Sequence, residues 1–303
     1  MNSLLQKFMD PQEQYIRKIQ NYIDRMPSLS TTVTKVLEVC NSPNASANDL
    51  NRVISLDPVL TGHVLRLINS AYYSLPNQVS SLARATIMLG LNTVKNLALS
   101  TAVVGALGKK SSFTTLPMDP FWAHSICVGV TAKALAAERG VPNANREEYF
   151  VAGMLHDLGK IPLNTCFSES YGQALQLASL EQGPLLRAEQ LLVGVDHGVA
   201  GRLIGEKWRL SPGIIEALAL HHAPERASDV HRELVSTVAL ANLYANIYEI
   251  GSAGDIYPDS AFLMTILEIM GLTWKELQPM QAIVNSEIDK AQVFLHLTER
   301  EAQ

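Results

Sequence analysis

The chain has 303 residues, of which 47% are hydrophobic and 17% are charged, and its formal net charge is −5. This composition excludes a disordered chain and is typical of a compact protein with one large domain or two smaller ones. No basic cluster is longer than the pair Lys109-Lys110. Because nucleic-acid binding requires a basic surface, we expect no DNA partner.

The apolar stretches are too short for membrane targeting. Lys7 and Asp10 interrupt the N-terminal segment "MNSLLQKFMDPQEQ", and the later run "LALSTAVVGALG" cannot span a bilayer. Cys40, Cys127 and Cys166 are odd in number and stand in apolar surroundings, which predicts free core thiols. We therefore expect a cytoplasmic protein without a membrane span.

The first third of the chain predicts a series of helices. Ile16, Ile19, Ile23 and Met26 recur at helical spacing. Helix starts and stops are predicted at Ser46 with Asp49 (a capping box), at Asp57 with Pro58, and at Gly90. The tyrosines of "NSAYYSLP" are interpreted as packing residues rather than as a ligand site.

The polar, proline-containing stretch "LGKKSSFTTLPMDP" is the predicted boundary between two parts of the chain. Beyond it, further helices are expected over residues 119–140, 146–159, 211–222, 231–250, 259–270 and 273–296. No segment has the alternating pattern of a strand or the turn of a hairpin. The sequence therefore predicts an all-α protein.

Five of the eight histidines stand between residues 124 and 222: His124, His156, His197, His221 and His222. They belong to four predicted helices or helix ends, which a helical bundle can bring together. With Asp157 they could bind a divalent transition metal, namely zinc, iron, manganese or nickel. Local roles are the alternative: the His221-His222 pair suits a helix C-terminus, and His197 could pair with Asp196. From the residues alone, both interpretations stay open.

Longer motifs carry a family resemblance. "HDLGK" at 156–160, with a separate preceding His, resembles the HD superfamily of metal-dependent phosphohydrolases. From about residue 20 to 250 the chain is similar to the HDOD family of bacterial signalling modules. The motifs that carry this similarity are Asp57-Pro58, "NSAYY", Leu89-Gly90-Leu91, "FWAHS" and "GMLHDLGK". The resemblance implies a multi-helix HD-type bundle with an N-terminal helical subdomain (1–110), an HD-like subdomain (111–250) and C-terminal helices (251–303) that pack on the module.

The resemblance also implies a metal cage for one or two ions. Its ligands would be His124, His156 and Asp157, with His197, His221 and His222 matching the extra ligands of the HD-GYP phosphodiesterases. Lys160 matches a lysine that contacts substrate phosphate, so Lys160 and Asp157 are the candidate catalytic residues. A cation in the last turn of a helix is the alternative for Lys160.

Two departures from the superfamily pattern weaken the case for an enzyme. Asn242 stands where the closing Asp of the cage is expected, and "HHAPERASDV" lacks the Gly-Tyr-Pro signature. A cyclic dinucleotide substrate therefore has no support, and the ion position of His124 and His156 is expected to be impaired.

We expect a bacterial signal-transduction module that binds a metal and acts through a signalling protein partner in trans, because no receiver, cyclase or kinase segment is found in the sequence. One alternative is a metal-dependent phosphohydrolase that binds a phosphoester or nucleotide, with Lys160 stabilising the developing charge. The other is an oxygen-using di-iron enzyme of related architecture.

Overall fold

The computed structural model describes residues 11–26, 29–40, 42, 46–107 and 115–291. Within these ranges all regular structure is helical, as predicted, and no strand occurs. Residues 108–114 of the predicted linker lie outside the described residues, and its last three residues begin the helix Met118–Glu138. The division of the chain near residue 110 stays a prediction.

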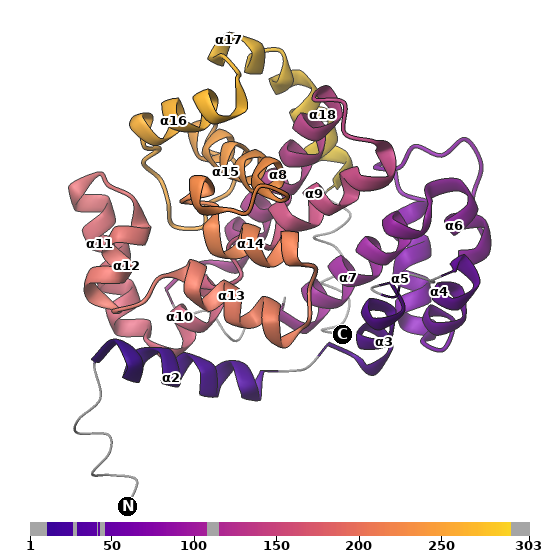
Figure 1. The fold of residues 1–303 in the computed structure, drawn as a ribbon, viewed down its shortest axis with the longest axis horizontal. Helices are drawn as coiled ribbons and strands as arrows, with labels where there is room; N and C mark the ends of the chain where they lie inside the picture. Colours follow the sequence, from indigo (N-terminus) through magenta and orange to yellow (C-terminus); the bar gives the residue numbers. More distant parts are fainter. Residues whose placement is uncertain (1–10, 27–28, 41, 43–45, 108–114, 292–303) are drawn as a thin grey trace, which may run out of the picture.

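Four short helices and one long helix form the N-terminal part, on the right of Figure 1. They are α3 (Thr31–Cys40), α4 (Ala47–Ile54), α5 (Pro58–Ile68), α6 (Leu82–Leu89) and α7 (Leu91–Leu107). The short helices pack on one another and on α7, which extends from this part into the centre of the molecule.

The predicted helix starts and stops are present. Ser46 Oγ accepts a hydrogen bond from the backbone N–H of Asp49, and the Asp49 carboxylate accepts one from the backbone N–H of Ser46, each at 3.2 Å. Asp57 caps α5 by accepting a hydrogen bond from Leu60 N at 3.0 Å. Gly90 ends α6 with φ +86°. The caps at Ser46 and Asp57 satisfy backbone N–H groups that have no partner within the helix itself.

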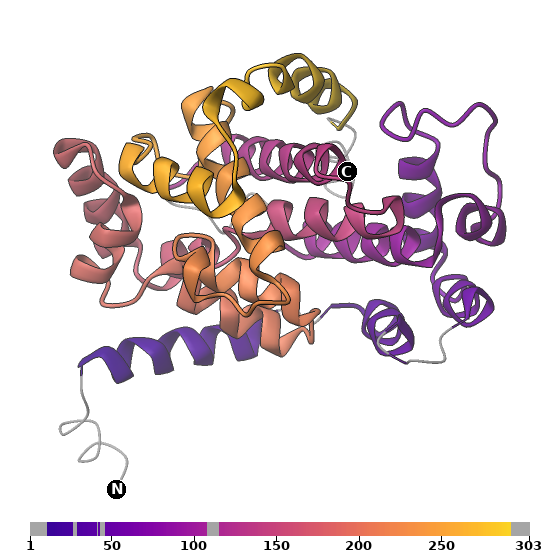
Figure 2. The same ribbon diagram turned by 45° about the horizontal axis from the view of Figure 1, so that its top comes forward.

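The first helix, α2 (Pro11–Arg25), lies away from the other N-terminal helices. It packs on α10 (Lys160–Cys166) and α13 (His197–Lys207), along the lower edge of the molecule in Figures 1 and 2. Lys207 Nζ donates to the carbonyl oxygens of Ile23 and of Met26, the latter at 3.2 Å. The first described helix of the chain therefore packs on helices of the second half, and the helices α3–α7 that follow it form the N-terminal part.

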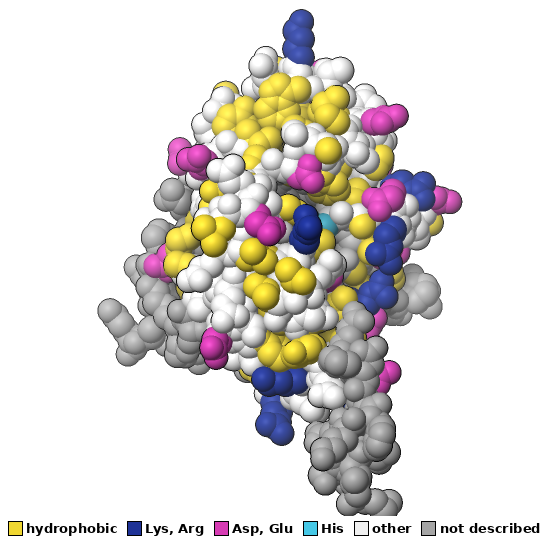
Figure 3. All heavy atoms as spheres, turned by 90° about the vertical axis from the view of Figure 1, so that its left-hand side faces the viewer, with side chains coloured by type: hydrophobic (Ala, Val, Ile, Leu, Met, Phe, Trp, Pro, Cys, Tyr) yellow, Lys and Arg dark blue, Asp and Glu magenta, His cyan; other side chains and the backbone are white. Residues whose placement is uncertain are grey.

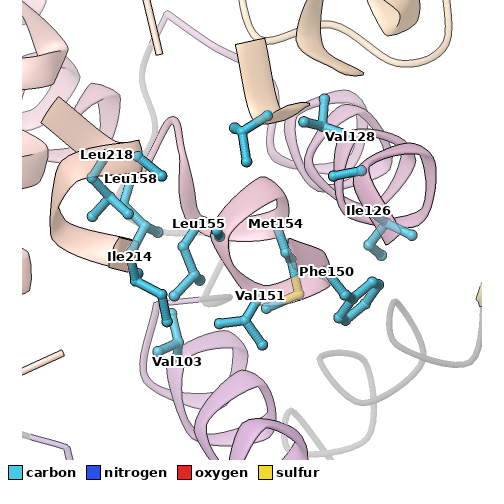
Figure 4. Packing of buried hydrophobic residues seen from close by; sticks show 14 of the residues in the cluster. Val103, Ile126, Val128, Phe150, Val151, Met154, Leu155, Leu158, Ile214 and Leu218 are labelled. Carbon is cyan, nitrogen blue, oxygen red and sulfur yellow. The ribbon is translucent and has the colours of Figure 1, made fainter. Parts of the chain in front are cut away.

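The centre of the fold is α9 (Asn143–Leu155), which is buried along its last seven residues. It is surrounded by α7, α8 (Met118–Glu138), α14 (Pro212–Leu220) and α15 (Arg232–Ile247). Figure 4 shows part of this packing, in which side chains of α9 meet those of its neighbours: Val103, Ile126, Val128, Phe150, Val151, Met154, Leu155, Leu158, Ile214 and Leu218. The last seven residues of α9, "YFVAGML", carry no charge and are nearly all apolar, so this part of the helix lies in the core.

Two glycines bring α8 and α9 into close contact. A Cβ at Gly153 would lie 2.8 Å from the Cα of Gly129, and a Cβ at Gly129 would lie 2.7 Å from the carbonyl oxygen of Phe150. Any larger residue at either position would push the helices apart. The contact fixes the α8 side chains relative to the end of α9.

An aromatic contact joins the N-terminal part to this core. Tyr72 is buried, and its ring centroid lies 5.6 Å from that of Phe150. The ammonium of Lys133 lies 4.5 Å from the centroid of Tyr72. The interpretation of "NSAYYSLP" as packing residues is confirmed for Tyr72.

The remaining elements cover the core. They are α11 (Ser168–Glu181), α12 (Leu185–Leu192), η3 (Pro224–Arg226), α16 (Ser260–Met270), α17 (Trp274–Leu277) and α18 (Met280–Ala291). The C-terminal helices pack on the module through α16 against α15 and α18 against α8. The single helix predicted over 273–296 is wrong, because Pro279 separates α17 from α18. Proline lacks the N–H that a continuous helix requires, and its ring clashes with the carbonyl group of the preceding turn. Residues 292–296 lie outside the described range.

The prediction of core thiols holds in part. Cys127 is buried. Cys166 is only half-buried, because it is the last residue of α10 and lies where that helix reaches the surface. The side chain of Cys40 lies outside the described residues. Among the described helices, none is by itself long and apolar enough to cross a membrane; only the pair Leu82–Leu89 and Leu91–Gly105, bent by 119°, passes on length and composition.

Candidate metal centre

The residues predicted as metal ligands meet in one cluster at the ends of several helices. The set is His124 in α8, His156 and Asp157 after α9, His197 at the start of α13, and His221 and His222 after α14. All but His222 are at most 1% exposed. The structure brings these residues together; their role as metal ligands stays a prediction.

Asp157 divides the cluster into two halves. Its Oδ1 faces His197 and His221, with distances of 3.4 and 3.7 Å to their Nε2 atoms. Its Oδ2 faces His156 and His124, with distances of 3.2 and 3.9 Å to their Nε2 atoms. One carboxylate therefore presents an oxygen to each half.

In the first half, three imidazole nitrogens converge. His197 Nε2 lies 3.2 Å from His221 Nε2 and 3.1 Å from His222 Nε2. Ligands around one tetrahedral ion with bonds of about 2.0–2.1 Å lie roughly 3.3 Å apart. The contacts of His197 with His221 and His222 have this spacing, and the ligand nitrogens of the three rings all lie within 4.8 Å of one another. Asp157 Oδ1 lies beside two of these rings, so the three imidazoles form a candidate group for one ion with a carboxylate next to it.

Hydrogen bonds outside the cluster set the orientation of three of the rings through Nδ1. The pairs are His156 with the carbonyl oxygen of Gly153 at 2.6 Å, His221 with that of Ala217 at 3.0 Å, and His197 with the Glu189 carboxylate at 2.6 Å. Because these oxygens can only accept, Nδ1 donates in each ring. The Nε2 lone pair of each neutral ring then points into the cluster, as in a metal-binding histidine.

The cluster contains buried atoms whose hydrogen-bonding capacity is unused. His156 Nε2 and Asp157 Oδ1 have no hydrogen-bond partner among the described residues. A buried acceptor without a partner costs about 1–3 kcal/mol. These two acceptors belong to adjacent residues at the end of α9 and lie among imidazole nitrogens. Buried oxygen and nitrogen atoms with unused lone pairs fit a bound cation, and histidine with carboxylate suits a divalent transition metal.

The electrostatics favour neutral imidazoles and an ionised carboxylate. Burial lowers the pKa of His222 to about 3 and that of His124 to about 4. Burial, together with the neighbouring His222, also holds the pKa of His221 well below its usual value. Burial alone would raise the pKa of Asp157, but His156 and Lys160 outweigh it and keep this pKa well below its usual range. These protonation states are the ones that bind metals.

His197 differs from the other rings. Burial opposes its protonation, but the Glu189 carboxylate outweighs burial and raises the pKa of His197. The same carboxylate makes Nε2 more basic and hence a stronger ligand. A proton and a metal ion compete for this nitrogen.

The second half is weaker. Asn242 Oδ1 lies 3.0 Å from His124 Nε2 and 3.4 Å from Asn246 Nδ2. An amide oxygen in this position accepts a hydrogen bond from the Nε2–H of His124 and supplies no negative charge. Asn242 faces the cluster. It is the residue that the HD-superfamily resemblance aligns with the closing Asp.

Lys160 is completely buried, and three oxygens surround its ammonium. Asp157 Oδ2, Asp255 Oδ2 and the carbonyl oxygen of Ala253 each lie 2.9 Å from Nζ. Burial would lower the pKa of Lys160, but the two carboxylates outweigh it and raise this pKa above its usual value. Lys160 is the first residue of α10, so the alternative role in the last turn of a helix is wrong.

Two acidic residues of this network were missed in the sequence. Glu189 is fully buried in α12, and its Oε2 accepts from both Nδ1 and the backbone N–H of His197, at 2.6 and 2.9 Å. Asp255 accepts from Lys160 and, through Oδ1, from the backbone N–H of Leu185 at 2.9 Å. The apolar neighbours of Glu189 in "LLRAEQLL" were its only sequence signal, and Asp255 lies in a loop without a motif.

A close backbone contact places His197 beside the end of α9. A Cβ at Gly159 would lie 1.8 Å from the carbonyl oxygen of His197 and 2.6 Å from Gly201 N. Only glycine allows α13 to approach the turn that carries His156 and Asp157. The glycine of "HDLGK" therefore has a structural role in assembling the cluster.

His222 connects the cluster with the surface. It is the partly exposed residue among the six of the cluster. Its ring centroid lies 6.3 Å from that of Phe262 in α16. Figure 3, which views the molecule from the left-hand side of Figure 1, shows a face on which apolar side chains are interspersed with charged ones and very little histidine surface is visible. His222 is therefore the member of the cluster that solvent can reach.

Comparison with known proteins assigns the family. The HDOD domain model matches residues 26–224, about two thirds of the chain. The chain belongs to the HDOD family. This match agrees with the HD-type helical architecture described above.

Similar proteins have been found in several bacteria. An HDOD domain protein of unknown function from Geobacter sulfurreducens is 24% identical, with a TM-score of 0.71 over 92% of this chain and 98% of that one. A proposed phosphohydrolase from Shewanella amazonensis is 23% identical, with a TM-score of 0.68 over 91% and 98% of the two chains. An uncharacterized protein of Treponema pallidum is 25% identical over 74% of this HDOD chain and 43% of its own length. The chain thus spans less than half the length of this curated relative.

Proposed function

We propose that this HDOD protein is a regulatory module that binds one divalent transition metal and acts in signalling through a protein partner. The observation that carries the metal site is the convergence of His197, His221 and His222, whose ligand nitrogens lie within 4.8 Å of one another, beside Oδ1 of Asp157. Histidine nitrogens with one carboxylate suit zinc, iron, manganese or nickel.

The surroundings favour a structural metal over a catalytic one. Lys160, the candidate for contact with a substrate phosphate, already has three oxygens around its ammonium. Asn242 removes a negative charge from the half that contains His124. An ion that holds α9, α13 and α14 together would stabilise the fold, as structural zinc does in other proteins.

The test is elemental analysis of the full chain, purified without chelator. We expect about one metal ion per chain. His221→Ala and Asp157→Ala should each lose it, whereas His63→Ala, which changes a histidine in α5 outside the cluster, should retain it. Wild-type protein with well under half an equivalent, even after reconstitution, contradicts the metal site. Equal losses in all three variants would contradict the choice of ligands.

A metal-dependent phosphohydrolase is the second candidate. It is supported by the partial exposure of His222 and by the structural similarity to a proposed metal-dependent phosphohydrolase from Shewanella amazonensis. A bound metal would supply Lewis acidity and an activated water for attack on a phosphoester or nucleotide. We expect slow turnover at most, because Lys160 is engaged and Asn242 is neutral.

Assays of simple phosphodiesters and nucleotides with manganese, iron and nickel separate the two candidates. Phosphoester turnover that is lost in Asp157→Ala supports the enzyme. Turnover that survives Asp157→Ala places the chemistry outside this cluster. Oxygen consumption by the iron-loaded protein would instead indicate the di-iron alternative. Absence of both activities in metal-loaded, folded protein supports the regulatory module.

A further inference from the structure

We propose that the ammonium of Lys160 takes the place of a second metal ion, so that the cluster is built to hold one ion and not two. The inference rests on the proposed metal binding. It concerns how many ions the cluster accepts and which residue sets that number.

The first argument is the position of the ammonium. Asp157 Oδ1 serves the half formed by His197, His221 and His222, and Oδ2 faces the half formed by His124 and His156. Lys160 Nζ lies 2.9 Å from Oδ2. A cation is therefore already paired with the oxygen that a second ion would need.

The ammonium is also fixed in place. Lys160 is fully buried, and the carbonyl oxygen of Ala253 and the carboxylate of Asp255 both accept hydrogen bonds from Nζ. Both acceptors belong to the loop between α15 and α16. Nζ donates hydrogen bonds to Ala253 and Asp255 and forms an ion pair with Asp157 Oδ2, each over 2.9 Å. These contacts hold the ammonium beside Oδ2.

The second argument is the charge of the cluster. The buried or nearly buried acids are Asp157, Glu189 and Asp255, and Lys160 is the cation among them. With neutral imidazoles the net charge is two negative units. One divalent ion cancels this charge, whereas a second would leave two positive units in a buried site, where charge without compensation is strongly unfavourable.

The third argument is the neutral side chain in the second half. The amide of Asn242 lies 3.0 Å from His124 Nε2, where a carboxylate would have served a second ion. Lys160 adds a positive charge to this half, and Asn242 lacks the negative charge that an Asp would carry. Both make the half less favourable for a second cation. Together they make that half a site for a hydrogen-bonded histidine and an ammonium.

Replacing the lysine tests this inference. The full chain and its Lys160→Met variant are stripped with chelator, and each is titrated with Zn²⁺ and separately with Mn²⁺. Bound metal is measured by elemental analysis and calorimetry. We expect one ion in the wild type and two in Lys160→Met, with the affinity for the second ion raised at least about tenfold by the loss of the ammonium.

A matched control removes another lysine of a buried ion pair. Lys133 pairs with Glu147, which is 3% exposed, and neither belongs to the cluster. Lys133→Met should cost stability but leave the metal stoichiometry at one. If Lys160→Met does not fold, Lys160→Gln is used, because its amide can still donate a hydrogen bond to the Ala253 carbonyl while carrying no charge.

The outcomes separate this inference from the proposed function. Two tightly bound ions in the wild type, or one ion in both folded proteins with unchanged affinity for a second, would overturn the role of Lys160 and leave the metal site standing. A wild type that binds no metal overturns the proposed function, and the role of Lys160 with it.

Discussion

Glu189 accepts two hydrogen bonds from His197, one from the ring Nδ1 at 2.6 Å and one from the backbone N–H at 2.9 Å. Both residues are fully buried. The carboxylate therefore fixes the tautomer of the ring, its direction and the start of α13. Glu189 in α12 thus positions His197, whose Nε2 lies 3.2 Å from His221 Nε2 and 3.1 Å from His222 Nε2.

Glu189→Gln should weaken metal binding without removing any direct ligand. The neutral amide is a poorer acceptor for Nδ1 and no longer raises the basicity of Nε2, and losses of such partners typically cost about 10–100-fold in metal affinity. Competition with a chromophoric chelator measures the change. Glu147→Gln, which alters a buried acid outside the cluster, is the control. An affinity that falls equally in both variants would show that Glu189 acts only through overall stability.

Asn242→Asp should raise the affinity for a second ion above that of the wild type, by about tenfold, because a carboxylate replaces a neutral amide in a buried site. Combining it with Lys160→Met should raise that affinity further. Metal stoichiometry and melting temperature are measured on the same preparation. An unchanged stoichiometry with a lower melting temperature would mean that the new carboxylate is buried without a partner and that Asn242 does not occupy a ligand position.

Removing the metal should destabilise the protein. An ion that binds only the folded chain adds about 2.7 kcal/mol when its free concentration is a hundred times its dissociation constant. Thermal unfolding with excess Zn²⁺ and with chelator measures this difference. His221→Ala should show almost no dependence on metal, while His63→Ala should respond like the wild type. A wild-type melting temperature that is the same with Zn²⁺ and with chelator would contradict a structural ion.

Much of the fold could be predicted from the sequence, because its signals are local. The caps at Ser46 and Asp57 act within four residues, and the apolar repeat of α2 is readable in a single window. The break at Pro279 was equally local and was missed, since the apolar pattern on both sides suggested one helix. The packing of α2 on α13 could not be predicted, because it joins segments far apart in the chain.

The candidate site also contains residues that could be predicted from the sequence and residues that could not. The histidines and Asp157 have a recognisable motif, so their common location was expected. The roles of Glu189 and Asp255 depend on distances between helices and loops that no local pattern encodes. The surroundings of Lys160 were misjudged for the same reason, since two of its three oxygens come from residues more than ninety positions later.

Two glycine substitutions should have opposite effects on stability. At Gly159 an added Cβ would lie 1.8 Å from the carbonyl oxygen of His197, and at that distance backbone atoms must move. Gly159→Ala should therefore cost about 3 kcal/mol and weaken metal binding, because α13 carries His197 away from Asp157. Gly62 lies within α5 and has no atom within 4 Å of the added Cβ. Gly62→Ala should stabilise the protein by about 0.5–1 kcal/mol through helix propensity and leave metal affinity unchanged. Chemical denaturation and chelator competition on both variants measure the two quantities. Equal metal affinity in the two folded variants would show that the close approach at Gly159 does not position the cluster.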